Sequence, residues 1–103
     1  MPIIQQKIKQ FCKENNFDSP LEFKMLDLYS ELGEFSKEIL KSTDYGKKEV
    51  AVDDEMVLEF GDIVYSLMTV ANELGIDAEQ AVDKAMEKYQ KRLNKKGEIE
   101  SGN

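Results

Sequence analysis

Apolar residues recur at every third or fourth position along most of the chain, and this spacing places them on one face of an α-helix. The pattern breaks at short polar or glycine-containing segments, so we expect four main helices at about residues 2–15, 20–41, 54–74 and 77–96. No segment alternates apolar and polar residues over a useful length, and no strand is expected. The pattern predicts an all-α fold, an antiparallel helical bundle in a single domain of residues 1–97.

Residues typical of helix N-termini stand before the second and fourth helices. Ser19 and Glu22, with Pro20 between them as the first helical residue, make a predicted capping box. Asp77 and Gln80 have the same spacing before the fourth helix. We therefore expect the side chains of Ser19 and Asp77 to accept hydrogen bonds from the first turns of these helices.

The other helix ends are marked by acids and a glycine. Asp53 or Asp54 suits the start of the third helix, and Gly75 suits a left-handed stop after its last turn. The polar run "STDYGKKEVA" is the longest expected loop. The segment 98–103 is expected to be a frayed tail.

The chain is acidic and of a size for one domain. It has 103 residues, of which 41% are hydrophobic and 34% charged, and a formal net charge of −7. This charge argues against nucleic acid or an anionic membrane as a partner. The partners that this charge still allows are a metal cation, a basic protein, or a small anion that arrives together with its cation.

The chain has no histidine and a single cysteine, Cys12. The first absence excludes a Ser–His pair and histidine-ligated zinc or iron. One thiol cannot form an internal disulfide, which fits a reducing compartment. No apolar run approaches the ~20 residues of a membrane span, and the first residues lack the apolar stretch of a signal peptide. We expect a cytoplasmic protein without a membrane contact.

Two similar acidic motifs, "ELGEF" and "EFGDI", lie in the middle of the second and third helices. Residues three or four positions apart share a helix face, so Glu31, Glu34 and Glu38 should point the same way. Glu59 and Asp62 should do the same on the third helix. The glycine in each motif suggests a close approach of the two helices or of a partner chain.

Two interpretations of these acids remain open at this point: a solvated acidic face and a metal site. Apolar residues flank both motifs, and no Lys or Arg lies between residues 49 and 83, so the charge needs a partner from elsewhere. Oxygen ligands without imidazole or thiolate favour Mg²⁺, Mn²⁺ or Ca²⁺. A di-iron bundle would need Glu-x-x-His motifs, which this chain lacks.

A basic stripe occurs on the fourth helix. Lys84, Lys88 and Arg92 follow one another at four-residue spacing and therefore lie along one line of the helix. Such a stripe can be a solvated surface near a helix C-terminus. It can equally bind the phosphates of a triphosphate that reaches the acids together with Mg²⁺.

The order of these features resembles the MazG-type nucleoside triphosphate pyrophosphohydrolases, members of the all-α NTP pyrophosphatase superfamily. Their pattern E-E-x-x-E, a spacer and E-x-x-D is matched by "SELGE", 24 intervening residues and "EFGD". The similarity continues through "GDIVYSLMTVANELGIDAEQAVDKAMEKYQKRL" and covers about residues 21–93. The resemblance implies Mg²⁺-dependent hydrolysis of (d)NTPs to the monophosphate and pyrophosphate, with Mn²⁺ as a substitute, in a homodimer or homotetramer.

The resemblance also implies roles for individual residues. The metal ligands would be Glu31, Glu34, Glu59 and Asp62. Lys88 and Arg92 would hold the substrate phosphates, and Lys84 lies on the same line. We expect Glu34 or Glu38 to orient the attacking water or to take its proton, as the catalytic group.

Ser30 stands where the family pattern has its first glutamate, which places the full activity in question. Two other functions remain open at this stage. One is a phosphoribosyl-ATP or dUTP-type pyrophosphohydrolase of the same superfamily, which would use the same acids. The other is a non-catalytic acidic helical module that binds a partner protein.

Overall fold

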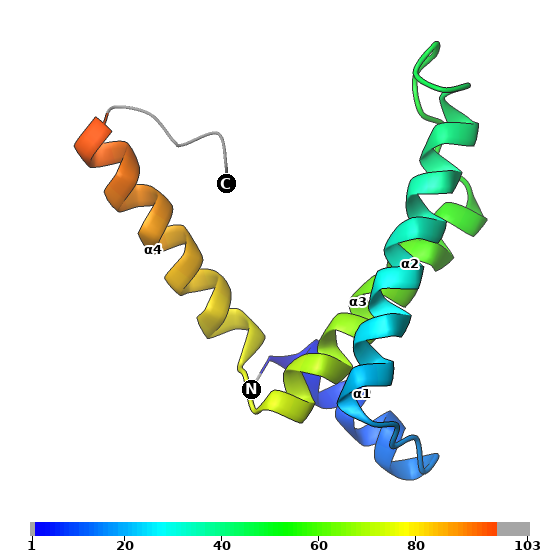
Figure 1. Cartoon of the computed structure of the whole chain (residues 1–103). Coiled ribbons are helices and arrows are strands. Elements are labelled where there is room, and N and C mark those ends of the chain that lie inside the picture. The colour runs from blue at the N-terminus through cyan, green and yellow to red at the C-terminus, as the bar shows by residue number, and fades with distance from the viewer. Residues whose placement is uncertain (1, 97–103) are drawn as a thin grey trace.

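The structure is a computed structural model that describes residues 2–96, and within this range it contains helices and no strand (Figure 1). The helices are α1 (Ile3–Glu14), α2 (Leu21–Ser42), α3 (Asp54–Leu74) and α4 (Ala78–Lys96). The predicted all-α fold is confirmed. The segment 98–103, expected to fray, lies outside the described residues. None of the helices within residues 2–96 is long and apolar enough to cross a membrane.

The long helices α2 and α3 form an antiparallel hairpin, and α1 packs against the C-terminal half of α3 (Figure 1). The apolar stripe of α3 supplies the buried apolar side chains, which are Met56, Met68, Val70 and Ala71. In the middle of the hairpin, the rings of Phe35 and Phe60 meet edge to face with centroids 5.9 Å apart. This contact fixes the spacing of α2 and α3 beside the two acidic motifs.

The fourth helix leaves this hairpin as a separate arm (Figure 1). The molecule is accordingly open, with extents of 48 × 37 × 24 Å. Val82 and Met86, apolar residues of α4 that a closed bundle would bury, are 56% and 62% exposed. The expectation that α4 packs against the other helices of the same chain is therefore not met. An apolar stripe can be buried only against another surface, and residues 2–96 of one chain do not bring such a surface to α4.

The sequence signals correctly placed the ends of α3 and the start of α4. The Asp53 carboxylate accepts a hydrogen bond from the Met56 N–H at 2.9 Å, and Gly75 ends α3 with a left-handed φ of 68°. The Asp77 carboxylate accepts from the Gln80 N–H at 3.0 Å. Local side-chain and backbone chemistry is sufficient to fix these ends.

The capping box predicted before α2 is wrong. Pro20 occupies the N-cap position, one residue before the helix, and no side chain caps the first turn. The Pro20 carbonyl accepts instead from the N–H groups of Phe23 and Lys24, at 3.0 and 3.1 Å. The Ser19 carbonyl accepts a hydrogen bond from the Lys24 ammonium, which also binds Glu73 on α3. The segment before α2 therefore takes part in a tertiary contact.

The two glycines of the acidic motifs do not mark a close approach within this chain. A Cβ atom added at Gly33 or at Gly61 would meet no atom of another helix within 4 Å. The expected approach of α2 and α3 at these points is therefore wrong. The approach of a partner chain at the same glycines stays a prediction.

Candidate active site

Three carboxylates from two helices meet near the middle of the α2–α3 hairpin. Glu31 comes from α2, and Glu59 and Asp62 come from α3; one oxygen atom of each lies within 4.8 Å of the others. We call these residues the acid cluster. Its members stand beside the Phe35–Phe60 contact, so packing of the apolar stripes brings like charges together. Such a cluster carries a repulsive energy that a proton or a cation can remove.

The pKa values within the acid cluster reflect this crowding. Partial burial raises the pKa of Glu31, and the negative charges of Asp62 and Glu34 raise it further. Desolvation also raises the pKa of Glu59, followed by a hydrogen bond with Glu55 and the charge of that carboxylate. Both acids are therefore easier to protonate in the folded chain than in water, and both would gain from a bound cation.

The donor set of the acid cluster fits a hard divalent cation. It offers carboxylate oxygens alone, and α3 itself carries no basic residue that would compete for them. Mg²⁺ is held in proteins by one or two carboxylates, and its other positions remain with water and phosphate oxygens. Three converging carboxylates on an open hairpin leave room for such additional ligands.

The other two acids predicted for the site lie apart from the acid cluster. Glu34 is exposed on the next turn of α2, and its charge reaches the cluster because it contributes to the raised pKa of Glu31. Glu38 is half-buried one turn further and pairs with Lys41 at 3.7 Å. Three of the four predicted metal ligands are thus brought together, and the roles of Glu34 and Glu38 stay predictions.

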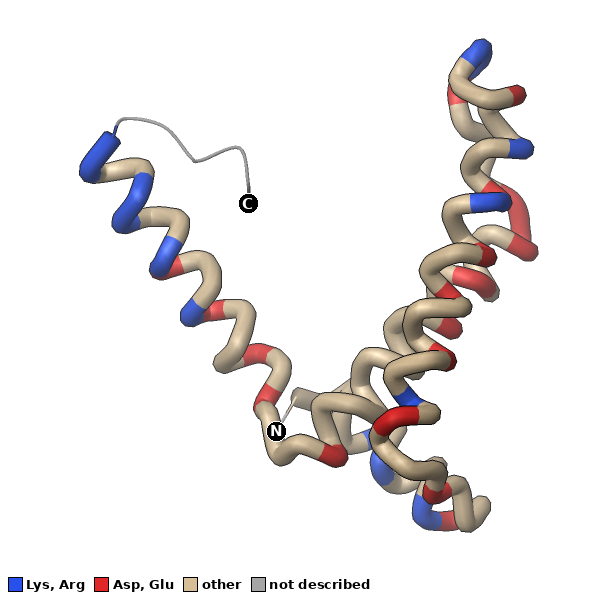
Figure 2. The backbone as a smooth tube through the Cα atoms, in the orientation of Figure 1, with Lys and Arg blue, Asp and Glu red and all other residues tan. Residues whose placement is uncertain are grey.

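The basic stripe lies on the arm and not at the acid cluster. Lys84, Lys88 and Arg92 line a shallow groove along α4, and the Lys88 ammonium sits 4.8 Å from the centroid of the Tyr89 ring. Figure 2 shows basic residues along the outer part of α4 and acidic residues along the α2–α3 hairpin. The two charged surfaces therefore occupy separate limbs of the same chain.

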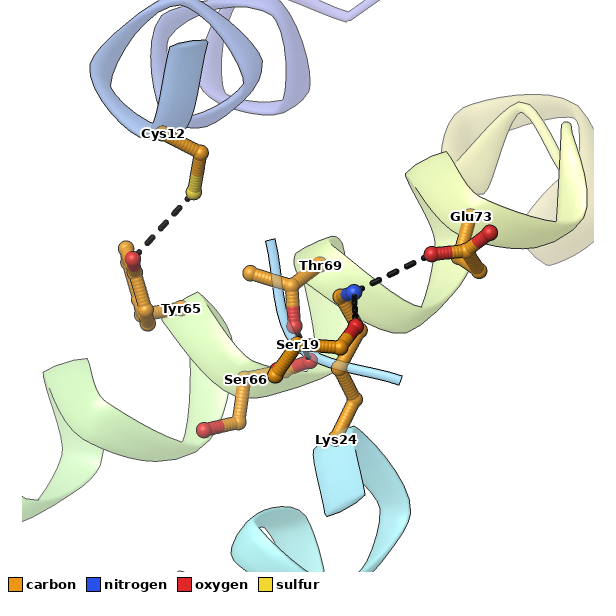
Figure 3. Close-up of polar contacts among 7 residues, drawn as sticks. All are labelled: Cys12, Ser19, Lys24, Tyr65, Ser66, Thr69 and Glu73. Carbon is orange, nitrogen blue, oxygen red and sulfur yellow. Dashed lines mark hydrogen bonds and ion pairs between the residues drawn. The ribbon is translucent and has the colours of Figure 1, made fainter. Parts of the chain in front are cut away.

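An open cavity of about 520 Å³ lies between α1, α2 and α3. The Lys24 ammonium, at its edge, binds the Glu73 carboxylate at 3.0 Å, and the Cys12 sulfur lies 3.2 Å from the Tyr65 hydroxyl (Figure 3). Burial, and next the contact with Cys12, raises the pKa of Tyr65 to about 12, so the phenol stays protonated. The lining residues are Cys12, Asn16, Phe17, Asp18, Ser19, Lys24, Asp27, Tyr65, Ser66 and Thr69.

The cavity adjoins the acid cluster through α2. Asp27 lines the cavity and lies one helical turn before Glu31, whose pKa it also helps to raise. The sequence reading missed this cavity, because its walls come from segments far apart in the chain. Cys12 and Tyr65, for example, are 53 positions apart, and no spacing in the sequence relates them.

This fold and the acid cluster define a class of protein: an all-helical chain with a carboxylate cluster whose donor set fits a divalent cation. The family model of the MazG nucleotide pyrophosphohydrolase domain matches residues 21–96, and the chain belongs to this family. It is therefore a hydrolase of the nucleotide pyrophosphohydrolase class, with a nucleotide as substrate. Members of the family generally depend on a divalent metal.

Two comparisons with proteins of Bacillus subtilis agree with this assignment. The chain is 39% identical over 92 residues to the uncharacterized protein YpjD of strain 168. This alignment covers 86% of this chain and 78% of YpjD. The crystal structure of YPJD, provisionally described as a pyrophosphatase, matches with a TM-score of 0.66 and 33% identity. That match covers 84% of this chain and 88% of YPJD, and confirms the family resemblance seen in the sequence.

Proposed function

We propose that the protein hydrolyses (deoxy)nucleoside triphosphates to the monophosphate and pyrophosphate in a reaction that depends on Mg²⁺ or, as a substitute, Mn²⁺. The observation that carries this proposal is the convergence of three carboxylates within 4.8 Å on a family fold that acts on nucleotides. Release of pyrophosphate from a panel of (d)NTPs, including dUTP, tests it directly. A folded protein that releases no pyrophosphate from any of them would exclude the proposal.

The residues of the acid cluster would hold the cation, and the acids beside it would handle the water. When bound, the cation neutralises charge on the phosphate chain and makes water more acidic, which carboxylates alone cannot do. Glu34, or Glu38 after release from Lys41, would orient the attacking water and take its proton. The water oxygen bonds to the α-phosphorus, the bond from this phosphorus to the bridging oxygen breaks, and pyrophosphate leaves with that oxygen.

We propose further that the site is completed by a second copy of the chain, in a homodimer or a homotetramer built from dimers. The negative acid cluster and the positive stripe of α4 are complementary in charge and lie on separate limbs of one chain (Figure 2). Many large apolar side chains are also exposed, more than a lone soluble chain usually leaves. On the hairpin and arm they include Phe23, Leu26, Tyr29, Val57, Leu58, Phe60, Val82 and Met86.

The cavity beside the acid cluster is the place that we propose for the nucleoside part of the substrate. Its volume of about 520 Å³ falls in the range of small-molecule pockets. Its walls offer an ammonium, two carboxylates and hydroxyl groups for hydrogen bonds to a base or a sugar. Phe17, at its edge, is 56% exposed and presents a ring on which a base can stack.

Replacement of Phe17 by alanine is expected to raise KM about tenfold, because stacking of one base on an aromatic ring contributes about 1–3 kcal/mol. The change in kcat should be smaller, since Phe17 is not among the acids that handle the water. Steady-state kinetics measures both values, and thermal melting checks that loss of the Phe11–Phe17 ring contact leaves the fold intact. Tyr45→Ala is the control, because this exposed ring lies in the α2–α3 loop, away from the cavity. A larger effect of Tyr45→Ala would assign the base to another place.

Mg²⁺ is expected to raise the melting temperature of the protein at pH 7.5. Because the pKa values of Glu31 and Glu59 are raised in the folded state, their favourable contribution to stability is present at low pH and is lost as the pH rises through those values. At neutral pH the cation replaces the lost protons. A concentration of one hundred times Kd adds about 2.7 kcal/mol, which corresponds to a shift on the order of 10 °C.

The same measurement at pH 4.5 should give a smaller shift, since protons then compete with the cation for the carboxylates. Scanning fluorimetry with Mg²⁺, Mn²⁺ and NaCl at matched ionic strength measures these shifts. Equal stabilisation by Na⁺ would show that the acid cluster is a solvated acidic face and not a site for a divalent cation. A shift of the melting temperature that is the same at both pH values would show the same.

A further inference from the structure

The side chain of Gln5, on α1, is fully buried although it is polar. A buried amide is costly unless its hydrogen bonds are satisfied. Here the Gln5 Nε2 donates to the Ile76 carbonyl at 2.6 Å, and the Gln5 Oε1 accepts from the Ala78 N–H at 2.9 Å. The Asn72 side-chain amide also donates to the Gln5 backbone carbonyl at 3.3 Å. Gln5 is thus bound to α3 and to the start of α4 at the same time.

These contacts lie at the joint from which the arm leaves. Ile76 belongs to the short segment between α3 and α4, and Ala78 is the first residue of α4. Gly75 turns the chain with its left-handed φ of 68°, and the Ile76 N–H is bound to the Ala71 carbonyl at 2.9 Å. Because α4 is not packed along the other helices (Figure 1), hydrogen bonds at the joint set its direction in place of side-chain packing.

We propose that Gln5 is a positioning residue that fixes the direction of α4 and so brings the basic stripe to the acid cluster of a second copy. An amide at this place supplies a donor for the Ile76 carbonyl and an acceptor for the Ala78 N–H. Loss of both bonds takes these partners from two part-buried backbone groups, the Ile76 carbonyl and the Ala78 N–H, and frees the joint to rotate. The second half of the proposal, delivery of the stripe, rests on the proposed function, whereas the effect on the direction of α4 does not.

Distances between spin labels on the hairpin and on the arm test the direction of α4. The labels are placed at Ser36→Cys on α2 and Gln90→Cys on α4, both exposed, in a Cys12→Ser background diluted with unlabelled protein. The parent should give one narrow distance distribution. Gln5→Met, which keeps the unbranched shape and removes both bonds, should lose the narrow peak. Gln10→Met, on the exposed face of the same helix, should keep it.

Gln5→Ala gives a second variant, which removes both bonds without adding bulk or charge at the buried position. It should also broaden the distribution, and it decides the matter if Gln5→Met does not fold. Parental distributions in the folded Gln5 variants would overturn the proposal. So would an equal loss of the peak in Gln10→Met.

Hydrolysis of a (d)NTP by the same variants separates the two halves of the proposal. If Gln5 delivers the basic stripe, kcat/KM should fall roughly tenfold or more in Gln5→Met, because a small misplacement of a substrate-binding group is costly. Gln10→Met should keep the parental value. Broadened distances in Gln5→Met, together with a parent that hydrolyses none of the nucleotides, would refute the proposed function and leave the role of Gln5 at the joint standing. Broadened distances with undiminished hydrolysis would overturn the delivery of the stripe by Gln5.

Discussion

Glu59→Gln is expected to lower kcat/KM for (d)NTP hydrolysis at least about 100-fold, since loss of a mere supporting contact to a metal ligand already costs 10- to 100-fold. The amide keeps the size of the side chain and removes one of the three anionic oxygens of the acid cluster. Pyrophosphate release at saturating Mg²⁺ measures the loss. Circular dichroism should show unchanged helix content, because the substitution also removes repulsion with Glu55 and Asp62.

Glu55→Gln is the matched control for this experiment. Glu55 lies one helical turn before Glu59, is hydrogen-bonded to it and is not part of the acid cluster. Its substitution should change kcat/KM only a few-fold and should preserve the thermal shift caused by Mg²⁺, which Glu59→Gln should remove. Full activity of Glu59→Gln together with a parental Mg²⁺ shift would show that Glu59 does not bind the cation.

Joint replacement of Lys88 and Arg92 by alanine is expected to lower kcat/KM about 100-fold, because positive charge then no longer stabilises the leaving pyrophosphate. The double variant Lys47→Ala and Lys48→Ala is the control. It makes the same change in net charge in the α2–α3 loop, outside the acid cluster and the basic stripe, and should hydrolyse like the parent. Steady-state kinetics at fixed ionic strength distinguishes a local loss from a general effect of charge.

A mixture of inactive chains tests whether the stripe acts across the interface. If α4 of one copy serves the acid cluster of the other, a dimer of Glu59→Gln with the Lys88 and Arg92 double variant contains one intact site. Refolding the two together should therefore restore part of the parental activity, whereas each alone should remain inactive. No recovery in a mixture that forms mixed dimers, as seen by native mass spectrometry, would place both limbs of each site in a single chain.

The order of helices could be predicted from the sequence because the forces that make them are local. Hydrogen bonds within a helix join residues four apart, and an apolar stripe needs only the right spacing to be visible in the sequence. The Asp53 cap and the Gly75 stop were correct for the same reason, since each acts within a few residues. The capping box predicted from local residues before α2 does not form. There the Lys24 ammonium donates to the Ser19 carbonyl and also binds Glu73, which is distant in the sequence.

The acids of the site were recognisable as two pairs, but which of them meet depends on the packing of α2 against α3. Spacing alone placed Glu31 and Glu34 on one helix face, and the family resemblance implied the same role for both. The contact between Phe35 and Phe60 sets how the two helices face each other, and it brings Glu31 to Glu59 and Asp62 while Glu34 stays exposed. The cavity around Tyr65 was missed altogether, because its residues are neighbours only after α1 has docked.

The sequence by itself thus determined the four helices, the positions of the acids and the basic stripe along them, and membership in the family that those motifs resemble. Only the tertiary structure decided which carboxylates converge and where α4 points. The physical reason is that helix formation and capping depend on residues a few positions apart. The convergence of the carboxylates depends on the contact of Phe35 with Phe60 between two helices, and the direction of α4 depends on contacts of Gln5 with Ile76 and Ala78 across more than 70 positions. The amide of one buried side chain can therefore direct an arm that periodicity alone would place in a closed bundle.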